Sequence, residues 1–484
     1  MRTIKFLSIL LLLCIGFSCD NQKIEKLPNI VLIFTDDQGY GDVGSYGAIG
    51  FTTPNLDKLA SEGMRFTNFY SAQAVCSASR AALLTGCYPN RIGVHGAYMP
   101  WATNGINENE ITLAEMLGEK GYYCGIVGKW HLGHHEKFLP LQHGFDEYFG
   151  IPYSNDMWPV NFDGKPVTDS SEAPWKMRYP ILPLIEGNEK IREIRTLEDQ
   201  NEITTLYTER AVKFINENKE KPFFLYMPHS MPHVPLGVSD KFAGKSDQGM
   251  YGDVMMEIDW SVGEILKTLE TLGLENNTLV IFATDNGPWL NFGNHAGTTG
   301  GLREGKGTSF EGGQRVPFIV KWPDRISNGV VCNKMAATLD VFPTLAEITS
   351  SSLPEHKIDG ISILPILEGK KDANPRNHLF YYYHKNNLEA VRKGNWKLVF
   401  PHASRSYEKV LPGNDGWPGS YETIETGLEL YDLRRDPGER YNVIDQYPEI
   451  VIELEALASL AKDDLGDDLT GFEGKNRRPP GTLE

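Results

Sequence analysis

Short hydrophobic runs alternate along the chain with longer segments in which hydrophobic positions recur every three or four residues. The short runs are typical of buried strands, and the longer segments are typical of helices that cover a sheet. The alternation predicts an α/β fold with helices on both faces of the sheet. The expected strands are residues 30–34, 122–127, 223–227, 278–283 and 318–321, and the expected helices are residues 56–62, 113–120, 205–218 and 253–272.

The pattern changes after about residue 375. Short strands with turn signals between them are expected at residues 379–383, 388–392, 396–400 and 428–433, and a helix at residues 450–461. These elements predict a small antiparallel sheet with one packed helix. Residues 407–426, rich in Gly, Pro and polar residues, are expected to form a long loop. The 484 residues would therefore divide into a catalytic domain, 28–374, and a C-terminal α+β subdomain, 375–484.

The first residues have the pattern of an export signal. Arg2 and Lys5 precede an apolar run, residues 6–17, which is too short to span a bilayer. The run ends at Gly16-Phe17-Ser18-Cys19, which resembles a relaxed bacterial lipobox with Cys19 as the acylated residue. We expect a signal peptide over residues 1–18 and a tether over 19–27. The protein would be exported and anchored by lipid at the cell envelope; the alternative is simple cleavage and a free periplasmic protein.

Charge and cysteine content narrow the class of protein. The net charge of −17 argues against general binding to nucleic acid or to an anionic membrane surface, although a local cationic pocket could still take an anionic substrate. Cys14 and Cys19 belong to the export signal. Besides Cys76, three cysteines remain, which predicts at most one disulfide: Cys87, Cys124 and Cys332.

Four of the expected strands end in polar, chemically capable residues. In open α/β sheets, ligands bind outside the carboxyl ends of the strands, so these residues are expected to converge on one site. The four segments are Thr35-Asp36-Asp37-Gln38-Gly39, Gly128-Lys129-Trp130-His131, Pro228-His229-Ser230-Met231-Pro232-His233 and Thr284-Asp285-Asn286-Gly287.

Two of those strand ends carry oxygen ligands. Asp36 and Asp37 follow one strand, and Asp285 and Asn286 follow another. Hard oxygen ligands of this kind suit Ca²⁺ or Mg²⁺ rather than zinc. Either pair alone would be interpreted as a helix cap and a turn aspartate.

Cys76 lies just before a helix-compatible segment, residues 79–84, with Arg80 four positions further on. A thiol at a helix N-terminus is expected to be acidified and reactive, because the backbone N–H groups and the dipole favour an anion. The alternative interpretation is a buried structural cysteine with a surface arginine.

Three segments resemble the signatures of the type I sulfatases, the formylglycine-dependent family. The first is Cys76-Ser77-Ala78-Ser79-Arg80 followed by Leu84-Thr85-Gly86, with Ala78 where most members carry proline. The second is the stretch from Gly125 to Gly133 that contains Lys129 and His131. The third is the glycine-rich loop that contains Lys306. The matches follow the order of the family and cover almost the whole mature chain.

The resemblance implies an alkaline-phosphatase-like fold with a mixed, mostly parallel sheet, and hydrolysis of a sulfate ester. It also implies that a maturation enzyme converts Cys76 to formylglycine and that Ca²⁺ is bound, with Mg²⁺ possible. The implied metal ligands are Asp36, Asp37, Cys76, Asp285 and Asn286, and the implied catalytic residues are Cys76, Arg80, Lys129, His131, His233 and Lys306. His233-Val234-Pro235 matches the family's His-x-Pro pattern better than His229 does.

In the implied reaction the hydrated aldehyde at position 76 attacks sulfur while His233 protonates the departing ester oxygen. Lys129, Lys306 and the cation neutralise sulfate oxygens in the transition state. His131 then takes a proton from the remaining hydroxyl, which expels sulfate and regenerates the aldehyde.

The substrate is indicated more weakly. Residues 150–157, which include Ser154 and Asp156, resemble a stretch of the arylsulfatase A and N-acetylgalactosamine-6-sulfatase group, and His402 resembles a substrate-side histidine from the C-terminal domain. A pocket closed by a second domain favours an exo-acting enzyme on a sulfated galactose or N-acetylgalactosamine. Two alternatives stay open: a metal-dependent phosphodiesterase or phosphonate hydrolase of the same superfamily, and an inactive glycan-binding protein.

Overall fold

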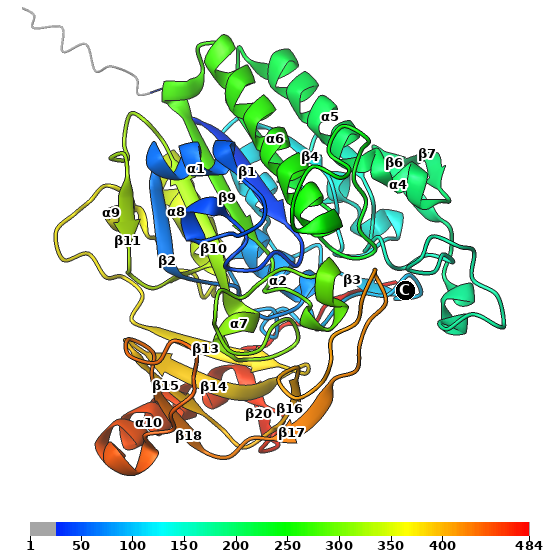
Figure 1. Cartoon of the computed structure of the whole chain (residues 1–484). Helices are drawn as coiled ribbons and strands as arrows, with labels where there is room; N and C mark the ends of the chain where they lie inside the picture. Colours follow the sequence, from blue (N-terminus) through cyan, green and yellow to red (C-terminus); the bar gives the residue numbers. More distant parts are fainter. Residues whose placement is uncertain (1–25, 484) are drawn as a thin grey trace, which may run out of the picture.

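The computed structural model describes residues 26–483. A large sheet with helices on both faces forms the upper part of the molecule, and a smaller antiparallel sheet lies beneath it (Figure 1). The predicted signal peptide and Cys19 lie outside the described residues. Within them, no helix has the length and apolar character needed to cross a membrane.

The large sheet confirms the mixed, mostly parallel arrangement. Its strand order is β11-β2-β10-β9-β1-β8-β4-β5-β6-β7, and β12 pairs with β2. The parallel centre consists of β9 (Thr278–Thr284), β1 (Asn29–Thr35), β8 (Phe223–Pro228), β4 (Tyr123–Val127) and β5 (Glu147–Gly150).

Antiparallel strands extend the sheet on both sides of this centre. On one side β10 (Arg315–Lys321) runs antiparallel to both β9 and β2 (Met64–Tyr70), and on the other β6 (Leu182–Glu186) and β7 (Glu189–Ile194) form a hairpin. The short strands β11 (Val330–Cys332) and β12 (Ala336–Ala337) pair in parallel with β2.

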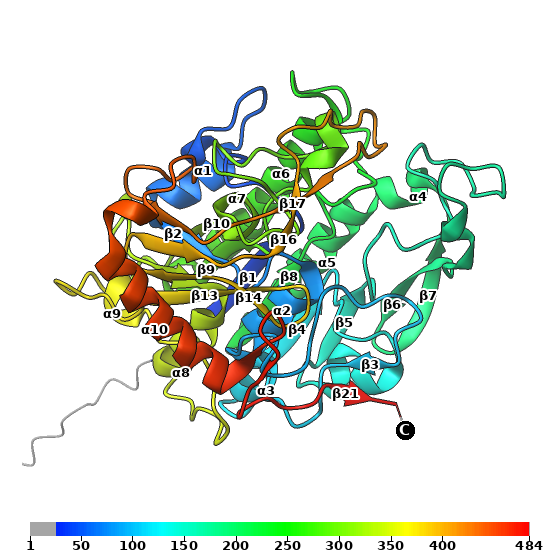
Figure 2. The ribbon, with the colours of Figure 1, turned by 90° about the horizontal axis from the view of Figure 1, so that it is seen from below.

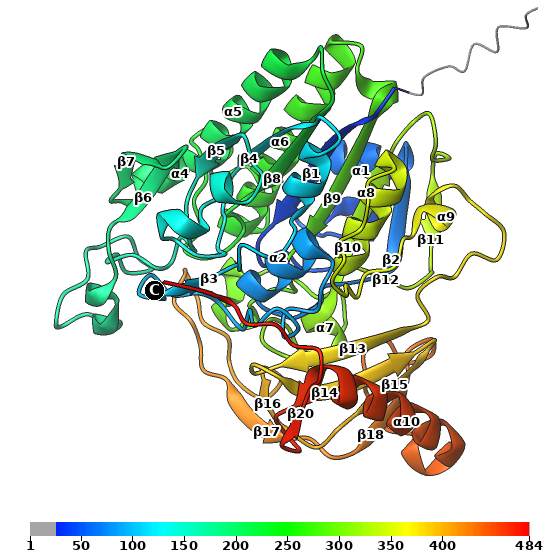
Figure 3. The same ribbon diagram turned by 180° about the vertical axis from the view of Figure 1, so that it is seen from behind.

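Alternate residues of β1 point to opposite faces, which explains why helices cover both. Val31 and Ile33 pack in one cluster with α1 (Pro54–Ser61), α5 (Ile203–Asn218) and α6 (Gly249–Thr271). Ile30, Leu32 and Phe34 pack in a second cluster with α2 (Cys76–Thr85), α3 (Leu113–Gly118) and α8 (Val341–Thr349). Figure 1 shows the first group of helices in front of the sheet, and Figure 3 shows α2 and α8 on the other face. The short helices are α4 (Leu197–Asn201), α7 (Glu311–Gln314) and α9 (Leu364–Leu367).

The predicted C-terminal sheet and helix are confirmed. The sheet order is β13-β14-β15-β18, all antiparallel, and the helix α10 packs against it (Figure 2). The hydrophobic cluster under α10 continues into Tyr70, Tyr88 and Phe310 of the large domain. The two parts therefore share one core. The bounds are β13 (His378–Tyr383), β14 (Asn387–Lys393), β15 (Trp396–Val399), β18 (Glu429–Asp432) and α10 (Pro448–Leu465).

The sequence predicted a long loop over residues 407–426, and this prediction is only partly right. Its end forms β17 (Glu422–Glu425), which pairs with β16 (Ala403–Ser406) as an antiparallel ribbon. Both strands are short and polar, so the hydrophobic alternation that marks a half-buried strand is missing. Two further ribbons join β19 (Gly466–Asp467) to β20 (Phe472–Glu473) and β21 (Gly481–Thr482) to β3 (Asn104–Gly105).

Candidate active site

The four strands that end in polar residues are neighbours in the sheet, in the order β9-β1-β8-β4. Because all four are parallel, their carboxyl ends meet at one edge, as the sequence predicted. Asp37 and His131, which follow two of these strands, have φ values of 60° and 63°. Such left-handed backbone is costly for residues other than glycine and is concentrated at functional sites.

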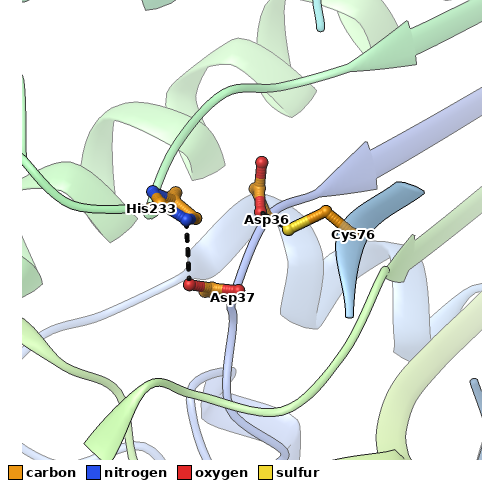
Figure 4. A group of neighbouring side chains, drawn as sticks. All are labelled: Asp36, Asp37, Cys76 and His233. Carbon is orange, nitrogen blue, oxygen red and sulfur yellow. Dashed lines mark hydrogen bonds and ion pairs between the residues drawn. The ribbon is translucent and has the colours of Figure 1, made fainter. Parts of the chain in front are cut away.

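Cys76 is the first residue of α2 and is 2% exposed. Its Sγ lies 3.7 Å from Asp36 Oδ1, so the nucleophile segment does reach the oxygen ligands (Figure 4). The expectation of an acidified thiol is wrong. Burial raises the pKa of Cys76 to about 12, and the nearby charges of Lys129 and Lys306 do not compensate. The unmodified side chain is thus a neutral thiol, not a thiolate nucleophile.

Three cations and three carboxylates form a buried network around Cys76. Lys129 pairs with Asp36, and Arg80 lies 2.9 Å from Asp285 Oδ2 and 3.2 Å from Asp36 Oδ2. Lys306 Nζ donates a 2.8 Å hydrogen bond to Asp37.

Burial and the neighbouring charges compete in setting the pKa values of these carboxylates. It acts to raise the pKa of Asp36, but the charges of Lys129 and Arg80 hold that pKa well below its usual range. Burial, reinforced by the negative charge of Asp36, raises the pKa of Asp285 to about 7. The network therefore concentrates charge of both signs in a dry site, where electrostatic interactions are strong.

The predicted metal ligands lie close to one another in the structure. One ligand atom from each of Asp36, Asp37, Cys76 and His233 lies within 4.8 Å of the others (Figure 4). Asn286 donates a 2.7 Å hydrogen bond from Nδ2 to Asp37, and its buried Oδ1 has no hydrogen-bond partner within residues 26–483. Asp285 accepts a 3.1 Å hydrogen bond from the backbone N–H of Asp37. Two carboxylates beside an orphaned amide oxygen fit a hard divalent cation.

Two histidines face the same space. His131 Nε2 donates to the carbonyl oxygen of Tyr98 at 3.0 Å, and its buried Nδ1 has no partner. Burial, followed by the charges of Lys129 and Arg80, lowers the pKa of His131 well below its usual value. His131 is therefore a neutral imidazole with a free lone pair on Nδ1.

His233 is positioned differently. Its Nδ1 donates to the carbonyl oxygen of Val234 at 2.6 Å, and its Nε2 lies 3.5 Å from both Asp37 Oδ2 and Ser154 Oγ. Ser154 in turn accepts a 3.2 Å hydrogen bond from Lys129. His229 is buried away from the cavity, which His233 lines.

A cavity of about 470 Å³ opens above Cys76 and His131. Ser154, Asp156, His233 and Lys306 line it, as the sequence analysis expected of a common site. Sequence reasoning missed the remainder of the wall, which includes Phe162, Trp175, Lys176, Tyr383, Arg405 and Tyr421. No local motif marks these residues, because chain folding alone brings their segments together.

His402 is the one predicted site residue that lies neither in the cavity wall nor in the buried polar network beside Cys76. It is buried in the C-terminal part, where its Nε2 lies 3.3 Å from Glu389 and its Nδ1 lies 2.7 Å from the carbonyl oxygen of Phe400. The C-terminal residues that reach the cavity are instead Tyr383, Arg405, Pro418, Gly419 and Tyr421.

The buried lysines, carboxylates, histidines and cysteine lie at the carboxyl ends of the parallel strands, where α/β proteins bind their ligands, and the lysines suit an anionic group. The sulfatase family model matches residues 28–351, and the model for the C-terminal region of aryl-sulfatase matches residues 374–476. The chain belongs to the sulfatase family, whose members are sulfuric ester hydrolases.

Individual relatives agree with this assignment. Arylsulfatase A of Bos taurus is 39% identical over 448 residues, covering 90% of this chain and 87% of the relative. N-acetylgalactosamine-6-sulfatase of Mus musculus is 40% identical over 436 residues, covering 86% and 81%. The crystal structure of a sulfatase from Pseudoalteromonas sp. superimposes with a TM-score of 0.79 at 29% identity, covering 90% of this chain and 91% of that one.

Proposed function

We propose that this sulfatase removes sulfate from a terminal sulfated sugar, most simply a galactose or N-acetylgalactosamine. The observation that carries the proposal is the position of Cys76 at the base of a cavity whose wall comes from both domains. The N-acetylgalactosamine-6-sulfatase relative supports the choice of sugar. The names of several relatives state that they act on sulfated carbohydrates.

Cys76 is proposed to act after conversion to formylglycine, whose hydrated aldehyde supplies a hydroxyl group that attacks sulfur. The neutral thiol of the unmodified residue supports this view, because a thiolate would require a lowered pKa. A maturation enzyme would carry out the conversion.

The cations of the site neutralise charge on the sulfate. Lys306, paired with Asp37, lines the cavity beside Cys76, and Lys129 is buried against Asp36, whose other oxygen lies 3.7 Å from the Cys76 sulfur. Arg80, buried against Asp285, fixes that carboxylate and adds positive charge behind the nucleophile. Preorganised charges of this kind stabilise the negative charge that develops in the transition state.

A divalent cation, Ca²⁺ or alternatively Mg²⁺, would supply further Lewis-acid polarisation. Asp36, Asp37, Asp285, Asn286 and the modified residue 76 would hold it. The orphaned Oδ1 of Asn286 supports this set, because a buried amide oxygen without a partner is costly unless a ligand satisfies it.

The two histidines divide the proton transfers. His233 presents Nε2 to the cavity beside Asp37 and Ser154, and in its imidazolium form, stabilised by Asp37, it would protonate the departing ester oxygen. His131 is neutral and has a free lone pair on Nδ1 among the described residues, so it would accept the proton that leaves the hydroxyl group when sulfate is expelled. Ser154 would bind the substrate near the sulfate, and Asp156 would bind the sugar.

A phosphodiesterase or phosphonate hydrolase is not favoured, because the relatives described above are named sulfatases. Export is proposed with the signal peptide and Cys19 as a lipid anchor at the cell envelope.

The test is a desulfation screen on defined sulfated mono- and oligosaccharides. Chromatography of the products measures sulfate release. We expect release from the non-reducing terminal sugar and little release from internal positions of a polymer. Efficient release from internal positions would contradict the exo-acting proposal, and the absence of release from every sulfated sugar would overturn the carbohydrate assignment.

A further inference from the structure

Lys176 is a buried lysine in the wall of the cavity, and nothing described so far uses its charge. It lies in the short 3-10 helix Pro174–Arg178 and is 2% exposed. Its Nζ lies 4.1 Å from the centre of the Phe162 ring and has no hydrogen-bond partner in the described chain. A buried ammonium group without hydrogen bonds is costly, and a cation–π contact recovers only part of that cost.

Asp156 is the matching acceptor. It also lines the cavity, and its buried Oδ1 accepts no hydrogen bond from any residue that the structure describes. Among the described residues, no ion pair joins Asp156 to Lys176. Burial acts to raise the pKa of Asp156, but the charges of His233 and Lys176 lower it, so the carboxylate is ionised and can only accept.

We propose that Lys176 and Asp156 form a donor–acceptor pair that binds two hydroxyl groups of the sulfated sugar. Lys176 donates to one hydroxyl oxygen, and Asp156 accepts from the other hydroxyl. This inference rests on the proposed carbohydrate substrate and deepens it, because it adds a residue that selects the sugar itself.

The charges of the pair favour a neutral ligand. An anion that pairs with Lys176 would meet the carboxylate of Asp156, and a cation that pairs with Asp156 would meet the ammonium group of Lys176. A hydroxyl group both donates and accepts, so a diol satisfies both side chains without a net charge. Phe162, Trp175 and Tyr179 line the same cavity and offer apolar surface to the carbon skeleton of a sugar.

The test compares Lys176→Met with the wild type on the sulfated sugar and on a series of its monodeoxy analogues. Methionine keeps an unbranched chain of similar length and removes the ammonium group. We expect kcat/KM on the parent sugar to fall about 100-fold, as for the loss of a hydrogen bond to a charged group. On one deoxy analogue, kcat/KM of the wild type should fall by a similar factor. On the same analogue, kcat/KM of Lys176→Met should fall no further.

Controls separate this result from loss of structure. Lys165→Met changes a fully exposed lysine of the same segment and should leave kcat/KM unchanged. Lys176→Met should melt no lower than the wild type, because it removes a buried charge without a hydrogen bond. Activity on 4-nitrophenyl sulfate, which has no sugar hydroxyls, should fall less than activity on the sugar.

Two outcomes would overturn the pair. In the first, Lys176→Met stays as sensitive as the wild type to every deoxy analogue. In the second, kcat/KM of Lys176→Met falls only on oligosaccharides in which a uronic acid is next to the sulfated sugar. That result would mean that Lys176 binds the carboxylate of the uronic acid. If the wild type releases sulfate from 4-nitrophenyl sulfate but from no sugar, the carbohydrate proposal itself fails.

Discussion

Lys397, in β15 of the C-terminal sheet, donates a 2.8 Å hydrogen bond to the carbonyl oxygen of Ser309, three residues after Lys306. Its Nζ also lies 2.7 Å from Glu439 and 3.3 Å from Glu311, and all three side chains are fully buried. The C-terminal sheet therefore holds the loop that carries a lysine of the candidate active site. The second domain supports the site from behind as well as lining its entrance.

We expect Lys397→Met to lower the free energy of unfolding by about 3–5 kcal/mol, because it leaves the buried Glu439 without the cation that pairs with it. Glu311, in contrast, keeps Arg392 and Arg315. Activity should fall as well, since the Lys306 loop loses its anchor. Denaturant unfolding and sulfate release measure the two effects. Lys393→Met is the matched control: its side chain is 44% exposed and pairs with Glu453 at the surface, so we expect a change below about 1 kcal/mol. Equal effects of the two substitutions would refute the anchoring role.

Cys76 should carry the mass of formylglycine when the protein is made in a host with the maturation enzyme. Mass spectrometry of the peptide that contains Cys76 measures this directly. Cys76→Ala should fold and lose sulfate turnover. Cys332→Ala, which changes another buried cysteine that does not line the cavity, should keep turnover. Normal turnover by Cys76→Ala would remove this residue from the mechanism.

Removal of the metal should abolish activity and lower the melting temperature. A ligand held at 100 times its Kd stabilises a folded protein by about 2.7 kcal/mol, and a chelator withdraws that contribution. In Asn286→Ala, which removes the orphaned amide oxygen, elemental analysis should find less metal and the chelator should shift the melting temperature less. Full activity after thorough chelation, with no metal found, would exclude the site.

His402 should contribute stability that depends on pH. Burial acts to lower its pKa, but the hydrogen bond and charge of Glu389 raise that pKa above its usual value of about 6.5. A raised pKa in the folded state gives a contribution that is complete below the unfolded-state pKa. This contribution is lost as the pH rises through the folded-state pKa.

The stability difference between wild type and His402→Gln should therefore be larger at pH 6 than at pH 9. Urea unfolding across this range measures it. Because His402 does not line the cavity, we also expect the variant to lose similar fractions of its activity on sugar and aryl sulfates. A stability difference that is constant with pH would show that Glu389 does not charge His402.

The parts of this site that sequence could predict are those fixed by strand direction. Asp36 and Asp37 follow one buried strand, and Asp285 and Asn286 follow another. Because these strands are parallel, the residues that follow them lie at the same edge of the sheet. The convergence of the four strand ends therefore followed from the pattern alone. The helix at Cys76 was also expected, since residues 79–84 are compatible with one.

Properties that depend on burial or on distant segments could not be predicted in this way. The pKa of Cys76 is set by desolvation, which no local motif reports. Lys176 reaches the cavity from an irregular segment, and Arg405 reaches it from a polar ribbon without hydrophobic alternation. The position of His402 against Glu389 depends on how the C-terminal strands pair.

The ribbon of β21 and β3 can form only late in the synthesis of the chain, because β21 lies near its C-terminal end. Gly481 completes a ribbon with Gly105, so a segment close to Cys76 in the sequence gains its partner only after hundreds of further residues have been made. In the folded chain Cys76 is 2% exposed and lines the cavity. For the proposed conversion to formylglycine, the segment around Cys76 is therefore more accessible to a modifying enzyme before this ribbon closes than in the folded chain.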